Sequence, residues 1–304
     1  MSKIIVTGGS GFLGSHLCSK LIEENHAVFV PRSKSFNLTN KDKCDKLINY
    51  MGVPDVVVHL AARCGGIGAN MQNPGKYFYE NMMMGINVIE SCREFKVPKI
   101  ILIGTVCSYP KHCAVPFKES EIWHGFPEET NAPYGIAKKS LYVMLDAYKK
   151  QYGLNSTILV PTNLYGPNDK FEDSTSHVIP ALIKKIYHAK INEEPSVEVW
   201  GDGSASREFL YVKDAADAIV KSIYTRTDTT PINLGTGEEV KIKDLAKKIK
   251  KLLHYNGELV FNHNLPNGQP RRCVDTTLAK NILQFTAKTD LNSGLQSTVD
   301  WFLD

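Results

Sequence analysis

The segment that most constrains the fold is a glycine-rich stretch near the start of the chain, VTGGSGFLGSHL at 6–17. Gly8, Gly11 and Gly14 follow an apolar run and precede apolar residues at helical spacing. In strand-to-helix turns of this kind, the first glycine permits a tight turn and the second lets the backbone approach a diphosphate. The third lets the helix pack closely on the strand, and the helix N-terminus attracts the anion. The stretch favours a dinucleotide site over a simple turn.

Short runs rich in Val and Ile recur along the chain between longer amphipathic stretches. Such runs are typical of buried parallel strands with helical crossovers. We therefore predict an α/β fold, a Rossmann-type doubly wound parallel sheet with a second, smaller α/β substrate-binding lobe. The expected strands lie in 3–9, 26–31, 55–62, 99–105 and 156–166. We assign 1–162 and about 211–236 to the dinucleotide-binding domain, and about 163–210 and 237–304 to the lobe that binds the nucleotide sugar.

Composition narrows the class of protein. The 304 residues are 42% hydrophobic and carry a net charge of +4, which is too small and too dispersed to indicate nucleic acid binding. The seven cysteines include no C-x-x-C pair, so we expect neither a disulfide framework nor a metal site. No leader-like segment or membrane-length apolar run is evident. We expect a cytoplasmic protein with no membrane association.

The segment after the second expected strand, VFVPRSKSFN, indicates which dinucleotide binds. It lacks the Asp or Glu that would contact the adenosine ribose hydroxyls. Arg32 and Lys34 can instead pair with a 2′-phosphate, which predicts NADP(H) rather than NAD. Solvated surface cations are the alternative for both residues.

A tyrosine and a lysine lie four residues apart in APYGIAKKSLYVMLDAY, so Tyr134 and Lys138 share one face of a helix. Lys138 can lower the pKa of the Tyr134 hydroxyl and hold a cofactor ribose, while Tyr134 gives a proton to a carbonyl oxygen. A pair at this spacing is by itself usually a surface pair. Here it follows a dinucleotide loop and a strand that ends in a hydroxyl residue, Thr105.

Together these elements resemble the extended short-chain dehydrogenase/reductase family, which implies that Thr105 completes a triad with the tyrosine and the lysine. HLAA at 59–62, NLYGP at 163–167 and REFLYVKDAADAI at 207–219 are similar to its nucleotide-sugar branch. Dehydratases of that branch carry an acid and a carboxylate after the triad hydroxyl. This chain has Val106 and Cys107 there, so it lacks that pair.

The Cys107 thiol suggests different chemistry. A thiolate beside a keto-sugar can remove a proton from the carbon next to the ketone, and His177 can return one from the opposite face. The simpler alternative is that Cys107 is a packed small hydrophobe and His177 an ordinary residue at a helix N-terminus.

The whole chain resembles the GDP-L-fucose synthase family, through AARCGGIGAN at 61–70, GTVCSYP at 104–110, EETNAPYGIAK at 128–138, PTNLYGPND at 161–169 and PNGQPRR at 266–272, among others. The resemblance implies epimerisation at C3 and C5 of GDP-4-keto-6-deoxy-D-mannose and NADPH-dependent reduction at C4. It assigns the base to Cys107 and the acid to His177, with Thr105, Tyr134 and Lys138 as the reductase triad and no metal. It also implies a homodimer through helices at about 76–96 and 134–152; a wholly intramolecular core is the alternative.

Two positions depart from that family. Thr105 stands where the family usually has serine, and it adds a methyl group near the substrate. Ser10 stands where the glycine loop can carry an arginine, so the NADP preference rests more on Arg32 and Lys34.

The expected ligand contacts form two sets. Besides Tyr134, Lys138 and His177, we expect the cofactor to contact Gly8, Ser10, Gly11, Phe12, Leu13, Gly14, Arg32, Lys34, Leu60, Ala61, Ala62, Pro161, Asn163 and Leu164. For the sugar, diphosphate and base, we expect Asn163, Lys185, Trp200, Arg207, Arg271 and Arg272.

Two other functions fit the same residues. One is a nucleotide-sugar 4-epimerase or 3,5-epimerase with tightly held NAD and no net reduction. The other is a non-enzymatic dinucleotide-binding protein, against which the intact set of catalytic residues argues.

Overall fold

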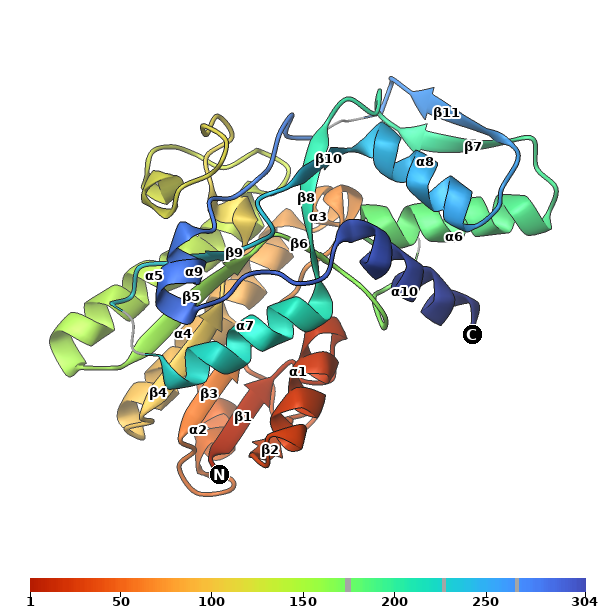
Figure 1. Cartoon of the computed structure of the whole chain (residues 1–304). Helices are drawn as coiled ribbons and strands as arrows, with labels where there is room; N and C mark the ends of the chain where they lie inside the picture. Colours follow the sequence, from red (N-terminus) through yellow and green to blue (C-terminus); the bar gives the residue numbers. More distant parts are fainter. Residues whose placement is uncertain (173–175, 226–227, 266–267) are drawn as a thin grey trace.

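A six-stranded parallel sheet forms the centre of the larger part of the chain (Figure 1). The computed structural model describes residues 1–172, 176–225, 228–265 and 268–304. The strand order is β2-β1-β3-β4-β5-β9, so the chain moves outward from β1 and then crosses back to β3. This order confirms the predicted doubly wound fold. The strands are β1 (Lys3–Thr7), β2 (Ala27–Phe29), β3 (Val56–His59), β4 (Lys99–Ile103), β5 (Ser156–Pro161) and β9 (Ile232–Leu234).

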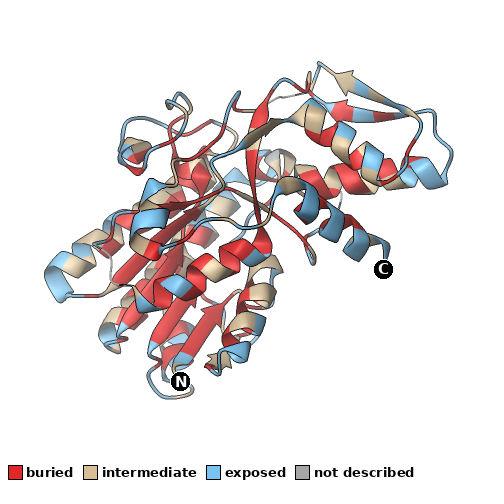
Figure 2. Cartoon of the chain, viewed as in Figure 1, coloured by how far each residue is buried: buried red, intermediate tan, exposed pale blue. Residues whose placement is uncertain are grey.

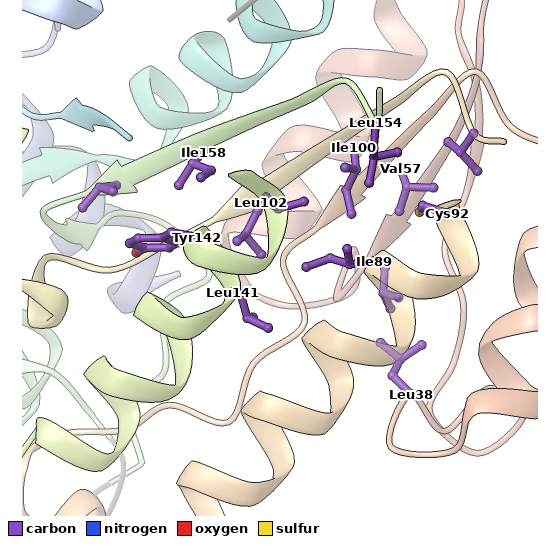
Figure 3. Packing of buried hydrophobic residues seen from close by; sticks show 14 of the residues in the cluster. Leu38, Val57, Ile89, Cys92, Ile100, Leu102, Leu141, Tyr142, Leu154 and Ile158 are labelled. Carbon is purple, nitrogen blue, oxygen red and sulfur yellow. The ribbon is translucent and has the colours of Figure 1, made fainter. Parts of the chain in front are cut away.

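Helices cover both faces of this sheet. Because successive strand residues point to opposite faces, Ile5 packs under one helical layer while Ile4 and Val6 pack under the other. Figure 2 shows the strands buried between the two layers, and Figure 3 shows Ile89 and Leu141 beside the sheet residues. One layer holds α2 (Lys41–Asn49), α4 (Pro74–Glu94) and α5 (Ala132–Tyr152); the other holds α1 (Phe12–Glu23), α7 (Val212–Tyr224) and α9 (Thr277–Leu283).

Two sequence predictions about helices can be compared with the structure. The expected helices at about 76–96 and 134–152 are present as α4 and α5, and each begins two residues earlier than expected. The placement of 277–285 differs from the predicted division of the chain, since we assigned it to the lobe. Ala279 and Leu283 share one helical face, which packs with Ile232 and Leu234 of β9 in the core of the main sheet. The remaining domain boundaries stay a prediction.

A smaller part contains two further sheets and its own apolar core (Figure 1). The predicted single run at 156–166 is split, because the chain leaves the main sheet after Pro161 and joins another sheet at Asn163. This crossing places Asn163 between the two parts. One sheet holds β6 (Asn163–Tyr165), β8 (Ser206–Tyr211) and β10 (Glu239–Lys241), the other β7 (Ser196–Trp200) and β11 (Glu258–Asn262). The helices here are α6 (Val178–Ile191), α8 (Ile242–Leu252) and α10 (Leu291–Leu303).

Short helices are also present in the described part of the chain. They are α3 (Ile67–Gln72) and the single-turn helices η1 (Val106–Ser108) and η2 (Glu119–Trp123). Within the described ranges, no helix combines the length and apolar character needed to cross a membrane.

Candidate active site

A cavity of about 1000 Å³ opens at the carboxyl ends of the main strands and continues into the smaller part. Its walls include the residues that follow β1, β3, β4 and β5, which is where α/β sheets bind ligands. Most of the predicted site residues line it: Gly8, Ser10, Gly11, Phe12, Leu13, Gly14, Leu60, Ala61, Ala62, Thr105, Cys107, Tyr134, Lys138, Pro161, Asn163, Leu164, His177, Lys185, Trp200, Arg207 and Arg272.

The glycine loop fits a dinucleotide diphosphate. Gly8 has φ +72°, and a Cβ there would lie 2.8 Å from the Ala61 nitrogen. A Cβ on Gly14 would lie 2.2 Å from the Gly8 oxygen, so this helix can approach the loop only with glycine there. Gly11 is the N-cap residue of α1 and provides no side-chain cap, and it lines the cavity together with Phe12 and Leu13 of the first helical turn. Such an end stabilises an anion.

Arg32 and Lys34 do not line the cavity with the other predicted cofactor residues. Both are exposed, in a turn that follows β2 and in which Ser35 and Phe36 donate backbone hydrogen bonds to the Arg32 carbonyl oxygen. Ser33, between them, does line the cavity. The turn therefore borders the site, and the contact of either cation with a 2′-phosphate stays a prediction.

Thr105, Tyr134 and Lys138 meet where η1 faces the first turns of α5. The side chains of Thr105 and Tyr134 interact with each other, and Lys138 is buried in the wall of the same cavity. The contact requires a glycine, because a Cβ at Gly135 would lie 2.2 Å from the Cys107 carbonyl oxygen. The Thr105 backbone N–H also donates to the Tyr142 hydroxyl at 3.0 Å, which fixes the turn.

The protonation states of this group differ in part from the prediction. Burial raises the pKa of Tyr134 well above its usual value, against our expectation that Lys138 lowers it. The reason is that desolvation of the phenolate is the largest influence on the pKa of this hydroxyl. Burial also lowers the pKa of Lys138 to about 8. Tyr134 therefore keeps its proton across the physiological range, as a proton donor requires.

Cys107 lies in η1 and contacts a buried cation. Its backbone N–H donates to the Thr105 hydroxyl at 3.2 Å, so Thr105 caps this turn. The Arg272 Nη1 atom lies 3.9 Å from the Cys107 Sγ atom. The structure thus brings Arg272, predicted as a substrate contact, to the thiol.

His177 occupies the N-cap position of α6 and lines the same cavity. It is open to solvent through the cavity, yet the surrounding protein lowers its pKa, and the positive charges of Lys170 and Arg272 lower it further. The sequence prediction assumed an unperturbed value. The imidazole is therefore neutral at neutral pH.

The predicted substrate residues divide into an inner group, an outer group and one that lies apart. Arg207 lies on β8 in the inner part, where burial and then the charge of Arg272 lower its pKa to about 10. At the outer end, the Lys185 Nζ atom lies 5.6 Å from the centre of the exposed Trp200 ring. Arg271 does not line the cavity: it is exposed and its Nε atom donates to Glu239 at 2.9 Å. Its side chain is directed away from the site because its neighbour Arg272 points inward.

Sequence reasoning missed a polar wall of the cavity. The Asn70 side-chain amide donates to the Asn131 oxygen at 2.7 Å, and the Asn131 amide donates to a Glu128 carboxylate oxygen at 2.8 Å. Asn70 and Asn131 line the cavity, as does Gln269. Asn70, Asn131 and Gln269 all lie within motifs that resemble the family, and this position was the signal in the sequence that could have identified them. Pro266 and Asn267 of the last motif lie outside the described residues.

A tyrosine and a lysine one helical turn apart share a cavity with a threonine and a glycine-rich dinucleotide loop. This combination defines the class: a dinucleotide-dependent enzyme of the short-chain dehydrogenase/reductase type. Residues 4–235 match the family described as the NAD dependent epimerase/dehydratase family. The chain belongs to this family.

Relatives and solved structures narrow the resemblance. The chain is 36% identical to a GDP-L-fucose synthase of Sinorhizobium fredii, over 99% of this chain and 95% of that protein. A GDP-6-OMe-4-keto-L-xylo-heptose reductase from Campylobacter jejuni has a TM-score of 0.93 at 28% identity, covering 99% of this chain and 97% of that one. An NADP-bound GDP-L-fucose synthetase from Naegleria fowleri has a TM-score of 0.88 at 29% identity, covering 99% and 94%.

Proposed function

We propose that the protein is an NADP-dependent epimerase and reductase that converts GDP-4-keto-6-deoxy-D-mannose to GDP-L-fucose. The observation that carries this proposal is the single cavity that holds both a reductase triad and a thiol with a histidine. The full-length similarity to GDP-L-fucose synthases supports it. The similarity to an NADP-bound structure supports NADP(H) as the cofactor.

Different residues of this chain bind the cofactor and polarise the keto group of the substrate. The Gly8 to Gly14 loop holds the cofactor diphosphate, and Lys138 holds its nicotinamide ribose. When bound, NADPH supplies the hydride that C4 receives. Tyr134 and Thr105 hydrogen-bond the keto oxygen, which makes the protons on the neighbouring carbons more acidic.

Cys107 and His177 carry out the epimerisation. Cys107 takes the proton at C3 and then the one at C5, and His177 returns a proton from the opposite face. The negative charge of the substrate offsets Lys170 and Arg272, so that His177 gains the proton that it donates. After inversion, Tyr134 protonates the oxygen at C4.

The test is incubation with GDP-4-keto-6-deoxy-D-mannose and NADPH in deuterated water, with the product read by NMR and mass spectrometry. Deuterium at C3 and C5 together with consumption of NADPH supports the dual activity. Reduction without deuterium would mean a plain 4-reductase. Deuterium without net consumption of NADPH would favour the isomerase alternative.

We expect kcat/KM for reduction to fall above pH about 8, by about tenfold per pH unit. The pKa of Lys138 is about 8 because burial disfavours its charge, so the ammonium that holds the ribose is lost as the pH rises through that value. Tyr134 stays protonated throughout. A pH profile of kcat/KM measures this, with Lys138→Arg as the comparison, since arginine keeps its charge. A decline at the same pH in Lys138→Arg would contradict the assignment.

The proposal also includes the oligomeric state and the cellular location of the protein. Phe78 and Tyr79 of α4 and Val143 of α5 are exposed, which supports a homodimer through these helices. All seven cysteines are free, which suits a cytoplasmic enzyme.

A further inference from the structure

The contact between Arg272 and Cys107 has no part in the function proposed so far, which treated Arg272 as a substrate contact. Arg272 is 8% exposed, and its Nη1 atom lies 3.9 Å from the thiol sulfur. A buried guanidinium needs partners of opposite polarity. The Cys107 sulfur is a strong partner for the guanidinium only as a thiolate, because the sulfur of a neutral thiol is a weak acceptor.

Gln269 holds the guanidinium in place. Its Oε1 atom accepts hydrogen bonds of 3.2 Å from both Nε and Nη2 of Arg272. Its own amide nitrogen donates to the Lys111 carbonyl oxygen at 3.0 Å and to that of Pro110 at 3.4 Å. Those two carbonyl groups fix which end of the amide faces Arg272, so Nη1 is left for Cys107.

The backbone around Arg272 is fixed as well. The Glu208 N–H donates to the Arg272 carbonyl oxygen at 3.0 Å, which ties the segment to β8. The Val274 N–H donates to a Glu208 carboxylate oxygen at 2.8 Å, and the Phe117 N–H donates to the Cys273 carbonyl oxygen at 2.8 Å. Arg272 is therefore a rigid cation held at the thiol.

Arg272 and Arg207 place positive charge near the thiol. Arg272 lies within electrostatic reach of both His177 and Arg207. Arg207, a second cation, also interacts electrostatically with Cys107.

We infer that Arg272, oriented by Gln269, stabilises the thiolate of Cys107 and so prepares it to remove protons from the keto-sugar. In that step the thiolate sulfur binds the proton from the sugar carbon, and the electrons of the broken C–H bond form the enolate. Arg272 then faces a neutral thiol, and it stabilises the thiolate again once the thiol has released that proton to solvent. The inference rests on the role of Cys107 in the proposed function.

The test measures the thiolate without any substrate. The rate at which iodoacetamide alkylates Cys107 is followed by peptide mass spectrometry across pH 5–10, because only the thiolate reacts. In Arg272→Met we expect the rate at neutral pH to fall about tenfold or more, as expected when an opposite charge at this range is removed. The midpoint of the alkylation profile should move to higher pH, while Arg272→Lys retains part of the effect.

Arg271→Met is the matched control, because the adjacent side chain lies outside the cavity and pairs with Glu239. It should leave the alkylation profile of Cys107 unchanged. Thermal unfolding and NADPH binding show whether each variant folds. An unshifted profile in both folded Arg272 variants would overturn the inference.

Deuterium exchange separates this inference from the proposed function. If Cys107→Ser still incorporates deuterium, Cys107 is not the base, whatever the alkylation profile shows. If Cys107→Ser loses exchange and Arg272→Met keeps both exchange and alkylation rate, only the role of Arg272 fails.

Discussion

Replacing Cys107 by serine should abolish deuterium incorporation at C3 and C5 of the sugar. A serine hydroxyl is a far weaker base than a thiolate at neutral pH, and removal of a positioned base costs about 10²- to 10⁴-fold in rate. The variant should still bind NADPH, because the glycine loop and Lys138 are unchanged. Mass spectrometry of the nucleotide sugar after incubation in deuterated water gives the exchange rate, and fluorescence titration gives the affinity for NADPH.

Cys64→Ser is the matched control for this experiment. Cys64 lines the same cavity and interacts electrostatically with both Cys107 and Tyr134. The Cys64 side chain is open to solvent, yet desolvation by the surrounding protein raises the pKa of its thiol, which keeps it protonated. We expect this variant to exchange deuterium at close to the unmodified rate. Loss of exchange in Cys64→Ser, with exchange retained in Cys107→Ser, would move the base to Cys64.

The sheet could be predicted from the sequence because its strands are continuous Val and Ile runs, buried on both faces. Val56–His59 is an example: all four residues are buried, and a run of this kind has few other stable locations. The break after Pro161 could not be predicted, because Asn163–Tyr165 continues the same apolar run in the sequence but pairs with β8 in another sheet. Pairing between distant strands is a tertiary property.

The candidate site, too, could be predicted only in part from the sequence. Tyr134 and Lys138 could be paired from sequence because helical spacing brings them together. The contact between Arg272 and Cys107 joins residues 165 positions apart. From the sequence, Arg272 could be identified only as a cation within a motif, and the usual partner of such a cation is a diphosphate. The lowered pKa of His177 likewise depends on Lys170 and Arg272, which only the folded chain places near it.

Replacing Tyr134 by phenylalanine should remove most of the reduction at C4, by about 10²- to 10⁴-fold in kcat. The variant loses the hydroxyl that protonates the oxygen at C4 and keeps the ring that packs in the cavity wall. Deuterium exchange at C3 and C5 should fall less, because Thr105 still donates to the keto oxygen and Cys107 is unchanged. Consumption of NADPH at 340 nm and deuterium content, measured on the same reaction, give the two rates separately.

Tyr148→Phe is the comparison for this variant, since it removes a hydroxyl from the same helix. The Tyr148 hydroxyl donates to a Glu90 carboxylate oxygen at 2.7 Å and does not line the cavity. Both of its rates should match those of the unmodified enzyme. If Tyr134→Phe reduced C4 at the unmodified rate, the proton would have to come from another donor, and Thr105 is the neighbouring hydroxyl. An equal loss of exchange and reduction would instead mean that Thr105 cannot polarise the ketone for exchange without Tyr134.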